Sequence, residues 1–352
     1  MKRFSPLGPV LALSLFSLGS CAPDGSPTGP SVAEETTAPS FATAANTWTT
    51  RAPLNTPRAG LKATAVNGII YAIGGSRAYN NSFRATVEAY DPGANSWTPR
   101  RALPEQLQPT GATTLNGKIY VAGGLGSGGY STALYVYDPA TNSWTRKAGL
   151  PYKGTRLGGH QGAINGLLYV YFGMTTNPDG TTGPQRFLRY NPATNTWASL
   201  KVPSFARAGG ASMVSSGRFY ILGGKLPRGG GVTGQASDVH VYNPASNAWS
   251  KLPLQLGGYY AVAEHAYATS KGKLYISGSD YSDGSYGVNR VYNPATNTAA
   301  SFAEPRYARY LAAGAAVNGQ FYNIGGYTCE QPSDQSPCDP TELAGAVEAY
   351  TP

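Results

Sequence analysis

The clearest chemical pattern in the chain is a set of four arginines that recur at one position of a repeated sequence. Each stands ten residues before a glycine that opens a Gly-x-apolar-Tyr step, and the four are Arg58, Arg156, Arg207 and Arg309. Leu107 and Val262 occupy the two other equivalent positions. Guanidinium groups that converge on one point can bind a carboxylate, sulfate or phosphate bidentately. This arginine column therefore predicts a ligand-binding site for an anion.

General acid–base chemistry would use a different set of side chains. His160 and His265 lie on segments that we expect to be innermost strands, and Glu264 precedes His265 directly. A catalytic acid or base must lie within about 3 Å of the proton it transfers. Neighbouring residues of a strand point to opposite faces, so Glu264 and His265 do not easily line one channel together. These three residues are candidates for catalysis, and the alternative for each is a structural role. His240, on an outer strand, is expected to be structural.

Six copies of one repeat position these residues. The tyrosines that mark its phase are 49, 49, 51, 55 and 47 residues apart, at Tyr71, Tyr120, Tyr169, Tyr220, Tyr275 and Tyr322. Between them lie short β-branched and aromatic runs bounded by Gly, Pro or Asn, which is typical of strands and turns. A period near fifty residues with several such runs indicates a four-stranded sheet repeated around an axis.

Two further features give the repeat a family resemblance. A double glycine closes the second strand at Gly74-Gly75, Gly123-Gly124, Gly223-Gly224 and Gly325-Gly326. A tryptophan follows the third-strand tyrosine by seven residues in four copies, at Trp97, Trp144, Trp197 and Trp249. This combination resembles the kelch repeat, which implies an all-β fold, a six-bladed kelch β-propeller with four strands per blade. In such repeats the arginine position commonly pairs with backbone carbonyls or a neighbouring blade, so a structural role for the column also stays open.

The ring is expected to close through the start of the domain. The last repeat stops at Tyr350-Thr351-Pro352, before any Asn-x-Trp, and the missing piece occurs as Asn46-Thr47-Trp48. We therefore expect the N-terminal strand, Asn46 to Thr50, to complete the last blade and remove two free sheet edges. The third and fifth copies are degraded, and the fifth has Ala299 where the others have tryptophan.

Two enzymes with related propellers set the alternatives for chemistry. Resemblance to the galactose oxidase propeller would imply a copper site, but no cysteine is free for the required cross-link and no Tyr-His pair is adjacent. We expect no cofactor and no metal. The periplasmic sialic-acid mutarotase is a six-bladed kelch ring that acts on a carboxylated sugar without a cofactor. The blade count and the arginine column fit that similarity, although its catalytic residues cannot be matched one by one.

The N-terminal segment has the pattern of an export signal. A basic pair precedes an apolar run in residues 1–20, and this run is too short to cross about 30 Å of hydrocarbon. Leu18-Gly19-Ser20-Cys21 resembles a bacterial lipobox, which implies lipid attachment at Cys21. Residues 21–45 are rich in Pro, Ser, Thr, Ala and Gly and are expected to be a flexible tether before a propeller over 46–352. The expected location is the bacterial cell envelope, exported and lipid-anchored, at the periplasmic or surface face of the outer membrane.

Charge and cysteine content narrow the partners. The whole chain carries a net charge of +9, and its cations are scattered rather than clustered in runs. For an exported domain this charge favours an anionic glycan or an acidic protein surface as the partner, and we expect no nucleic acid. We expect the protein to contact the membrane through its lipid alone and to be a monomer. Cys329 and Cys338, in one Pro-rich loop, are expected to form a disulfide. The predicted function is a binding module for such a partner, and the alternative is a cofactor-independent carbohydrate isomerase.

Overall fold

The strands of the chain pair in sets of four, as the repeat predicts. The computed structural model describes residues 45–77, 82–152, 159–173, 175–176, 182–207, 209–228, 231–255, 265–280, 285–329 and 345–352. All of them belong to one compact unit, Thr43–Pro352. No helix occurs in these described ranges, and they therefore contain no helix that could cross a membrane. The fold is all-β.

Six antiparallel sheets form the blades of a β-propeller, each listed from the innermost strand outward. Blade 1 contains β2 (Lys62–Val66), β3 (Ile69–Ile73), β4 (Val87–Asp91) and β5 (Ser96–Pro99). Blade 2 contains β7 (Ala112–Leu115), β8 (Lys118–Gly126), β9 (Gly129–Asp138) and β10 (Ser143–Lys147). Blade 3 contains β11 (Gly159–Ile164), β12 (Leu167–Phe172), β15 (Arg186–Asn191) and β16 (Thr196–Ser199).

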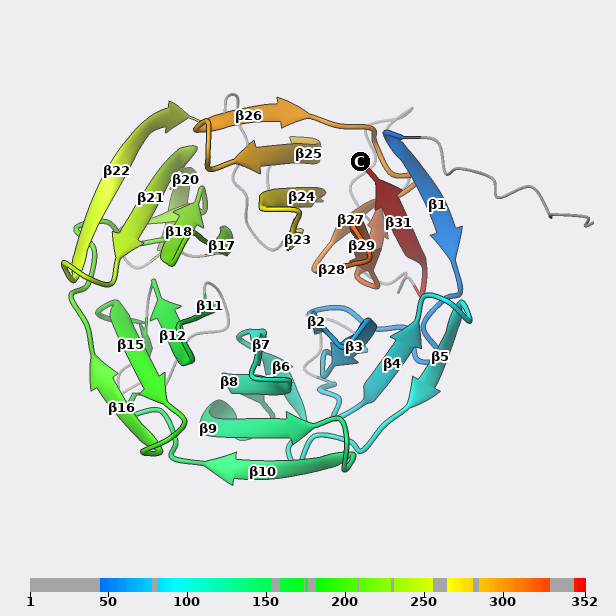
Figure 1. The fold of residues 1–352 in the computed structure, drawn as a ribbon, viewed down its shortest axis with the longest axis horizontal. Coiled ribbons are helices and arrows are strands. Elements are labelled where there is room, and N and C mark those ends of the chain that lie inside the picture. Colours follow the sequence, from blue (N-terminus) through cyan, green and yellow to red (C-terminus); the bar gives the residue numbers. More distant parts are fainter. Residues whose placement is uncertain are drawn as a thin grey trace, which may run out of the picture. The chain divides into compact units, whose positions relative to one another are not determined.

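The second half of the ring repeats this arrangement. Blade 4 contains β17 (Ala211–Ser215), β18 (Arg218–Leu222), β21 (Asp238–Asn243) and β22 (Ala248–Gln255). Blade 5 contains β23 (Ala266–Ser270), β24 (Lys273–Asp280), β25 (Ser285–Asn293) and β26 (Thr298–Ser301). Blade 6 contains β28 (Ala313–Val317), β29 (Gln320–Ile324), β31 (Val347–Thr351) and β1 (Thr47–Arg51). In Figure 1 the innermost strands surround the centre and the outermost strands form the rim.

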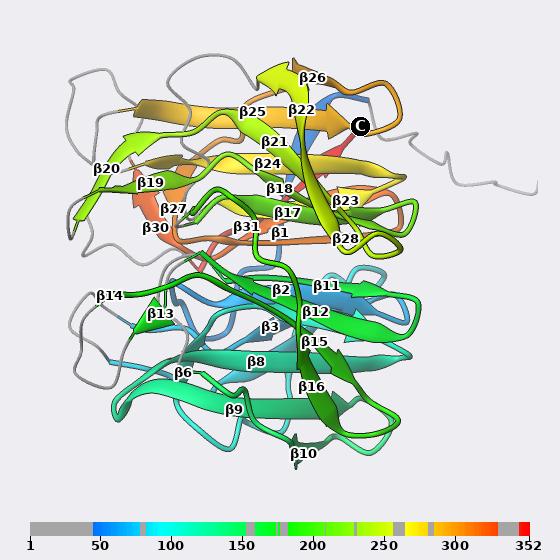
Figure 2. The ribbon, with the colours of Figure 1, turned by 90° about the vertical axis from the view of Figure 1, so that its left-hand side faces the viewer.

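Shorter strands extend the connections between the second and third strands of a blade and the connections between consecutive blades. They are β6 (Leu107–Pro109), which pairs with β8, the hairpins β13 (Thr175–Thr176) with β14 (Thr182–Gly183) and β19 (Lys225–Arg228) with β20 (Gly231–Gln235), and β27 (Ala308–Tyr310) with β30 (Tyr327–Cys329). Figure 2 shows both hairpins and the β27–β30 pair toward the same side of the ring. Sequence variation between the blades is therefore concentrated on that side.

The last blade takes its outermost strand from the start of the domain. Strand β1 pairs antiparallel with β31, and Trp48 lies opposite Tyr350. Trp48 packs on Phe302 and Phe321, with ring centroids 6.1 and 5.9 Å away. The apolar cores lie between consecutive blades, and one of them joins Val347 of blade 6 to Ile70 of blade 1. Pairing and core packing together join the first and last blades.

A two-bond latch ties the rim of each blade to the preceding one. In blade 2, for example, Trp144 donates its indole N–H to the Arg101 carbonyl (2.8 Å), and Asn142 accepts the Arg101 N–H (2.9 Å). Five of the six interfaces have both bonds. Between blades 4 and 5 the equivalent residues are Pro253, which has no N–H, and Ala299, which has no indole. There the half-buried Leu252 and Leu254 pack against the core instead.

Asparagine in a left-handed conformation shapes the turn that carries the latch. Asn95, Asn142, Asn195, Asn247 and Asn297 all have φ between 47° and 55°. Each accepts a hydrogen bond from the hydroxyl of the third-strand tyrosine of its own blade, at 2.7 to 3.2 Å. Asn46, with φ 57°, accepts the Tyr350 hydroxyl at the join between β1 and β31. Asparagine tolerates this backbone region better than other residues with a Cβ, which explains its recurrence.

Candidate functional site

The six innermost strands surround a central cavity of about 350 Å³. Most of its lining is small, with Ala, Gly or Thr supplied by every blade except blade 4, which supplies Ser212, Met213 and Val214. The larger polar side chains in the lining are Lys62, Gln161, Ser212, His265 and Tyr267. Lys62 is the one Lys, Arg, Asp or Glu among these described lining residues. A cavity of this size and polarity matches the small-ligand pockets of other proteins, which start near 300 Å³.

Hydrogen bonds between blades fix the walls of this cavity. The Thr64 and Thr114 hydroxyls are 3.0 Å apart, and Thr114 donates to the Ala65 carbonyl at 2.8 Å. On the far side, the Ser212 and Tyr267 hydroxyls are 3.4 Å apart. Burial raises the pKa of Tyr267, so its phenol stays protonated and can donate a hydrogen bond. The cavity lining therefore contains hydroxyl groups held in place by hydrogen bonds, together with one lysine.

Two of the predicted arginines are fully buried within their own blades. Arg58 donates to the carbonyls of Gly74 (2.9 Å) and Ala72 (3.1 Å), and it pairs with Glu88 at 3.3 Å. Both partners of this pair are almost completely excluded from solvent, with side chains 0% and 2% exposed. Burial lowers the pKa of Arg58, and the Glu88 charge opposes that effect. The pair occupies a polar site inside blade 1.

Arg309 repeats this arrangement in blade 6. Its guanidinium donates to the Glu348 carboxylate at 2.6 Å, to the Asn323 carbonyl at 3.0 Å and to the Ala346 carbonyl at 2.7 Å. Glu88 and Glu348 both stand two residues before the third-strand tyrosine of their blade. Removing either partner would leave a charge buried without compensation.

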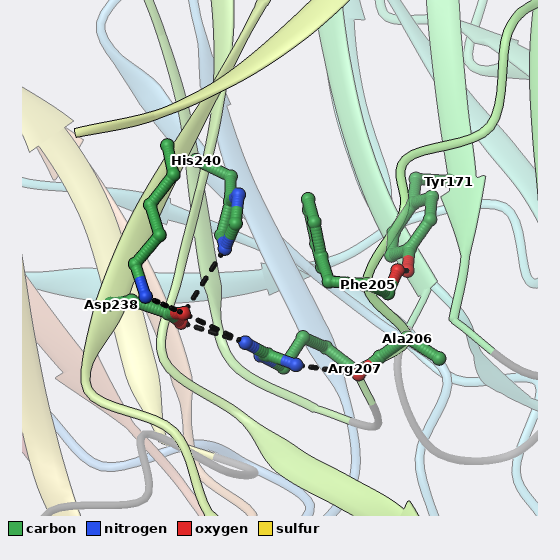
Figure 3. Close-up of polar contacts among 7 residues, drawn as sticks. Tyr171, Phe205, Ala206, Arg207, Asp238 and His240 are labelled. Atoms are coloured by element: carbon green, nitrogen blue, oxygen red, sulfur yellow. Dashed lines mark hydrogen bonds and ion pairs between the residues drawn. The ribbon is translucent and has the colours of Figure 1, made fainter.

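Blade 4 holds a wider version of the same arrangement (Figure 3). Arg207 reaches both oxygens of Asp238, at 2.8 and 3.0 Å. His240, which stands where blades 1 and 6 have glutamate, lies 3.1 Å from Asp238 and stacks on Phe205 with centroids 3.7 Å apart. Lys251 is 3.2 Å from the same carboxylate. Burial would raise the pKa of Asp238, but the hydrogen bond and charge of Arg207, with a further contribution from His240, lower it to about 2.

The structure thus directs the three described arginines toward carboxylates of their own blades. None of them lines the central cavity. Arg156 lies outside the described residues. The structure supports the pairing role that the sequence left open, and a ligand role for Arg58, Arg207 and Arg309 stays a prediction that would require these ion pairs to open.

Of the two histidine candidates, His160 is held by a backbone hydrogen bond and His265 lines the central cavity. His160 is 1% exposed, and its Nε2 lies 2.9 Å from the Gly209 carbonyl, so it donates there. Burial lowers the pKa of His160 to about 4. His265 is 3% exposed and lines the cavity. Glu264 lies outside the described residues, so its relation to His265 is not part of the described structure.

The cysteine assignments fall mostly outside the described chain. Cys329 ends β30, where its backbone pairs with Ala308. Cys338 and Cys21 lie outside the described residues, so the disulfide and the lipid attachment stay predictions. Among the described residues, no group of three or more His, Cys, Asp or Glu side chains is placed to hold a metal ion.

Sequence reasoning missed the cavity-lining residues Lys62, Gln161, Ser212 and Tyr267. All four stand five or six residues before the phase glycine of their repeat. The arginine column stands four to five positions further upstream, where the chain has not yet entered the innermost strand. Comparing the repeats position by position along that strand would have identified the lining.

Comparisons with known proteins agree with this architecture. A family model described as the KLHDC2/KLHL20/DRC7 Kelch-repeats domain matches residues 26–224. The solved structure of YjhT aligns with a TM-score of 0.65 at 17% identity, covering 86% of this chain and 97% of YjhT. At that identity the likeness concerns the fold alone.

Curated relatives match over shorter segments. Kelch-like protein 33 of Homo sapiens is 32% identical over 120 residues, 34% of this chain and 21% of that protein. An F-box/kelch-repeat protein of Arabidopsis thaliana is 29% identical over 92 residues, 26% of this chain and 18% of that protein. N-acetylneuraminate epimerase of Shigella flexneri is 36% identical over 87 residues, 23% of this chain and 22% of that protein. The matched segments span about a fifth of each relative. Because the family model covers more than half of the chain, this protein belongs to the kelch-repeat family.

Proposed function

We propose that this kelch propeller is a binding module that holds a small anionic polar molecule, such as an acidic sugar, in its central cavity. The observation that carries the proposal is the composition of the cavity lining. Lys62 supplies the one cationic side chain of the described lining, and Thr, Ser, Tyr and Gln side chains elsewhere in the lining supply hydroxyl and amide groups. A carboxylated sugar offers one negative charge and several hydroxyls, which such a lining complements.

The electrostatics near Lys62 support an anion rather than a cation. Besides burial, which is the larger effect, the positive charge of Lys62 helps to lower the pKa of the nearby His160. The buried arginines of blades 1 and 6 are already neutralised by Glu88 and Glu348, so they add little net charge to the centre. Lys62 is therefore the cationic side chain of the described lining with which a bound carboxylate could pair.

We also propose that the propeller works at the bacterial cell envelope, tethered through a lipid on Cys21. The basic pair, short apolar run and Leu-Gly-Ser-Cys sequence support this location. An exported address would expose the cavity to envelope glycans and to acidic sugars released from them.

The second candidate is a cofactor-independent carbohydrate isomerase acting in the same cavity. The segment that is 36% identical to an N-acetylneuraminate epimerase favours it. His265 is the described imidazole that lines the cavity and could move a proton. His160 is poorly suited, because its Nε2 proton is held by Gly209 and its Nδ1 is buried.

A pair of matched ligands tests the binding proposal. Isothermal titration of the mature domain with N-acetylneuraminate should give saturable binding, and its uncharged methyl ester should bind at least about tenfold more weakly. Lys62→Gln should weaken the acid and leave the ester unchanged, whereas Lys273→Gln, an exposed residue outside the cavity lining, should change neither. Equal affinities for acid and ester would refute the assignment of Lys62.

Catalysis needs a separate readout. If the cavity only binds, the rate at which the two anomers of N-acetylneuraminate interconvert, measured by NMR exchange spectroscopy, will match the rate in buffer. An enzyme-dependent rate that falls in His265→Gln while binding persists would favour the isomerase.

A further inference from the structure

A second cavity lies on the outer rim, between blades 1 and 2, away from the central one. Its volume is about 770 Å³, and it is lined by residues 100–104 on one side and 142–144 on the other. The first segment leaves the outermost strand of blade 1, β5, and the second enters that of blade 2, β10, which follows it along the rim in Figure 1. We call this cavity the rim groove.

The rim groove has a rigid floor. The backbone of Arg101 is held on both sides by the latch, through the Trp144 indole and the Asn142 amide oxygen. Trp144 is only partly buried, and it packs on Tyr137 with centroids 5.0 Å apart. The Arg101 side chain therefore starts from a fixed point beside an accessible aromatic ring. A preformed site of this kind loses little conformational entropy when a partner binds.

Charge is concentrated along this part of the rim. Arg100 and Arg101 line the groove, and Arg146 and Lys147 follow Trp144 on β10. All four are exposed, and none forms a salt bridge with a carboxylate of the described residues. Arg100 lies beside the Tyr71 hydroxyl, where its charge partly offsets the rise in the pKa of Tyr71 that burial causes.

Two acidic side chains close in sequence to these cations, Glu105 and Asp138, bind other residues. Glu105 follows the groove lining, and it accepts hydrogen bonds from Ser131 (2.9 Å) and Tyr135 (3.4 Å). Asp138 pairs with Lys118 at 2.7 Å. Neither Glu105 nor Asp138 forms a salt bridge with any of these four cations in the described structure.

This concentration is a property of blades 1 and 2 rather than of the repeat. The positions equivalent to Arg100 and Arg101 are Leu200 and Lys201 after blade 3, and Phe302 and Ala303 after blade 5. Only blade 1 places two arginines there. Latch geometry cannot be the reason, because it uses the backbone of the second residue, which is alanine in three blades.

We infer that the rim groove is a docking site for an acidic, extended segment of a partner protein. Carboxylates of that segment would pair with Arg100, Arg101 and Arg146, which lies on the same face of β10 as Trp144, and an apolar side chain would pack on Trp144. Arginine and tryptophan dominate the energy of protein–protein contacts, whereas a sulfated glycan would need only the charges. The partly exposed Trp144 ring in the groove lining therefore favours a peptide.

Fluorescence anisotropy with a short fluorescein-labelled peptide that alternates glutamate and leucine tests this inference. The mature domain should bind it saturably at physiological salt, and Arg100→Ser/Arg101→Ser should weaken binding at least about tenfold. Arg218→Ser/Lys273→Ser removes the same charge from the exposed first residues of β18 and β24 in blades 4 and 5 and should change binding less than about twofold. Thermal unfolding of each variant checks that both remain folded.

Three outcomes would overturn the inference. Equal losses in the two double variants would mean that the peptide senses only net charge. Full binding by the Arg100/Arg101 variant would place the peptide elsewhere. Equal binding of a peptide with serine in place of leucine, together with displacement by dextran sulfate, would indicate a polyanion site. Saturating N-acetylneuraminate should not compete, which separates this test from that of the central cavity.

Discussion

His160 should make the propeller less stable as the pH falls from the pKa of a free histidine, 6.5, to the pKa of this buried histidine, about 4. Its ring is 1% exposed and stacks near Tyr171, with centroids 5.9 Å apart. Nε2 donates to Gly209, and Nδ1 has no hydrogen-bond partner among the described residues. A second proton would therefore place an unpaired charge in the interior, which burial penalises and the charge of Lys62 penalises further.

The magnitude follows from the shift of the pKa from 6.5 to about 4. A lowered pKa means that the unfolded chain binds the proton first, so stability is complete above the unfolded value and is lost as the pH falls toward the folded value. At 1.36 kcal/mol per pKa unit, the loss is about 2 kcal/mol at pH 5 and about 3 kcal/mol at pH 4. Asp238, whose pKa is lowered from 3.8 to about 2, contributes below this window.

Urea unfolding at several pH values from 8 to 4, on the wild type and on His160→Gln, measures this contribution. Glutamine can keep the donor to Gly209 but cannot take up a proton. The difference between the two free energies of unfolding should change by about 2 kcal/mol between pH 8 and pH 5. His240→Gln serves as the comparison, because burial also lowers the pKa of His240 but Asp238 opposes that effect. A constant difference between wild type and His160→Gln across the range would refute the reasoning.

Three further changes test other parts of the structure. Trp48→Phe removes the indole donor to Ala303 (2.7 Å) and should lower the free energy of unfolding in urea by about 1 kcal/mol; an unchanged value would mean that this bond between β1 and blade 5 does not stabilise the ring. Arg309→Met should cost about 3 to 5 kcal/mol by the same assay, and adding Glu348→Leu should recover part of the loss; a further loss would contradict the pairing role. Cys21→Ser should abolish incorporation of labelled palmitate in a bacterial host, and persistent labelling would contradict the lipid assignment.

Repeat phase determined most of what could be predicted about the fold. The spacing of glycine, tyrosine and tryptophan reports local requirements, namely a turn, a hydrogen bond to asparagine and a core contact, and each recurs once per blade. The blade number and the strand number per blade were therefore correct. The lengths of individual strands were harder to predict. The double glycine Gly123-Gly124 predicts the end of a strand, whereas β8 and β9 continue past it to a hairpin at Ser127 and Gly128.

The site was predicted less well for a physical reason. An arginine near the channel can be directed to a ligand or to a carboxylate of its own blade, and only the distance to Glu88 or Glu348 distinguishes these possibilities. Both glutamates are about thirty to forty residues away in sequence. The lining residues, by contrast, are small or singly polar, and no local pattern marks them until the innermost strands are aligned around the axis.

The missing latch between blades 4 and 5 gives the ring a built-in weak point. A closed ring has no free end from which to unravel, so its first large fluctuation must begin at an interface. Pro253 and Ala299 leave that interface without the rim hydrogen bonds that hold the other five. Amide hydrogen exchange of β22 and β26 should therefore be faster than that of β10 and β16, and mechanical opening would begin there. The break in the chain between β31 and β1, which their strand pairing and the Tyr350–Asn46 hydrogen bond span, would open later.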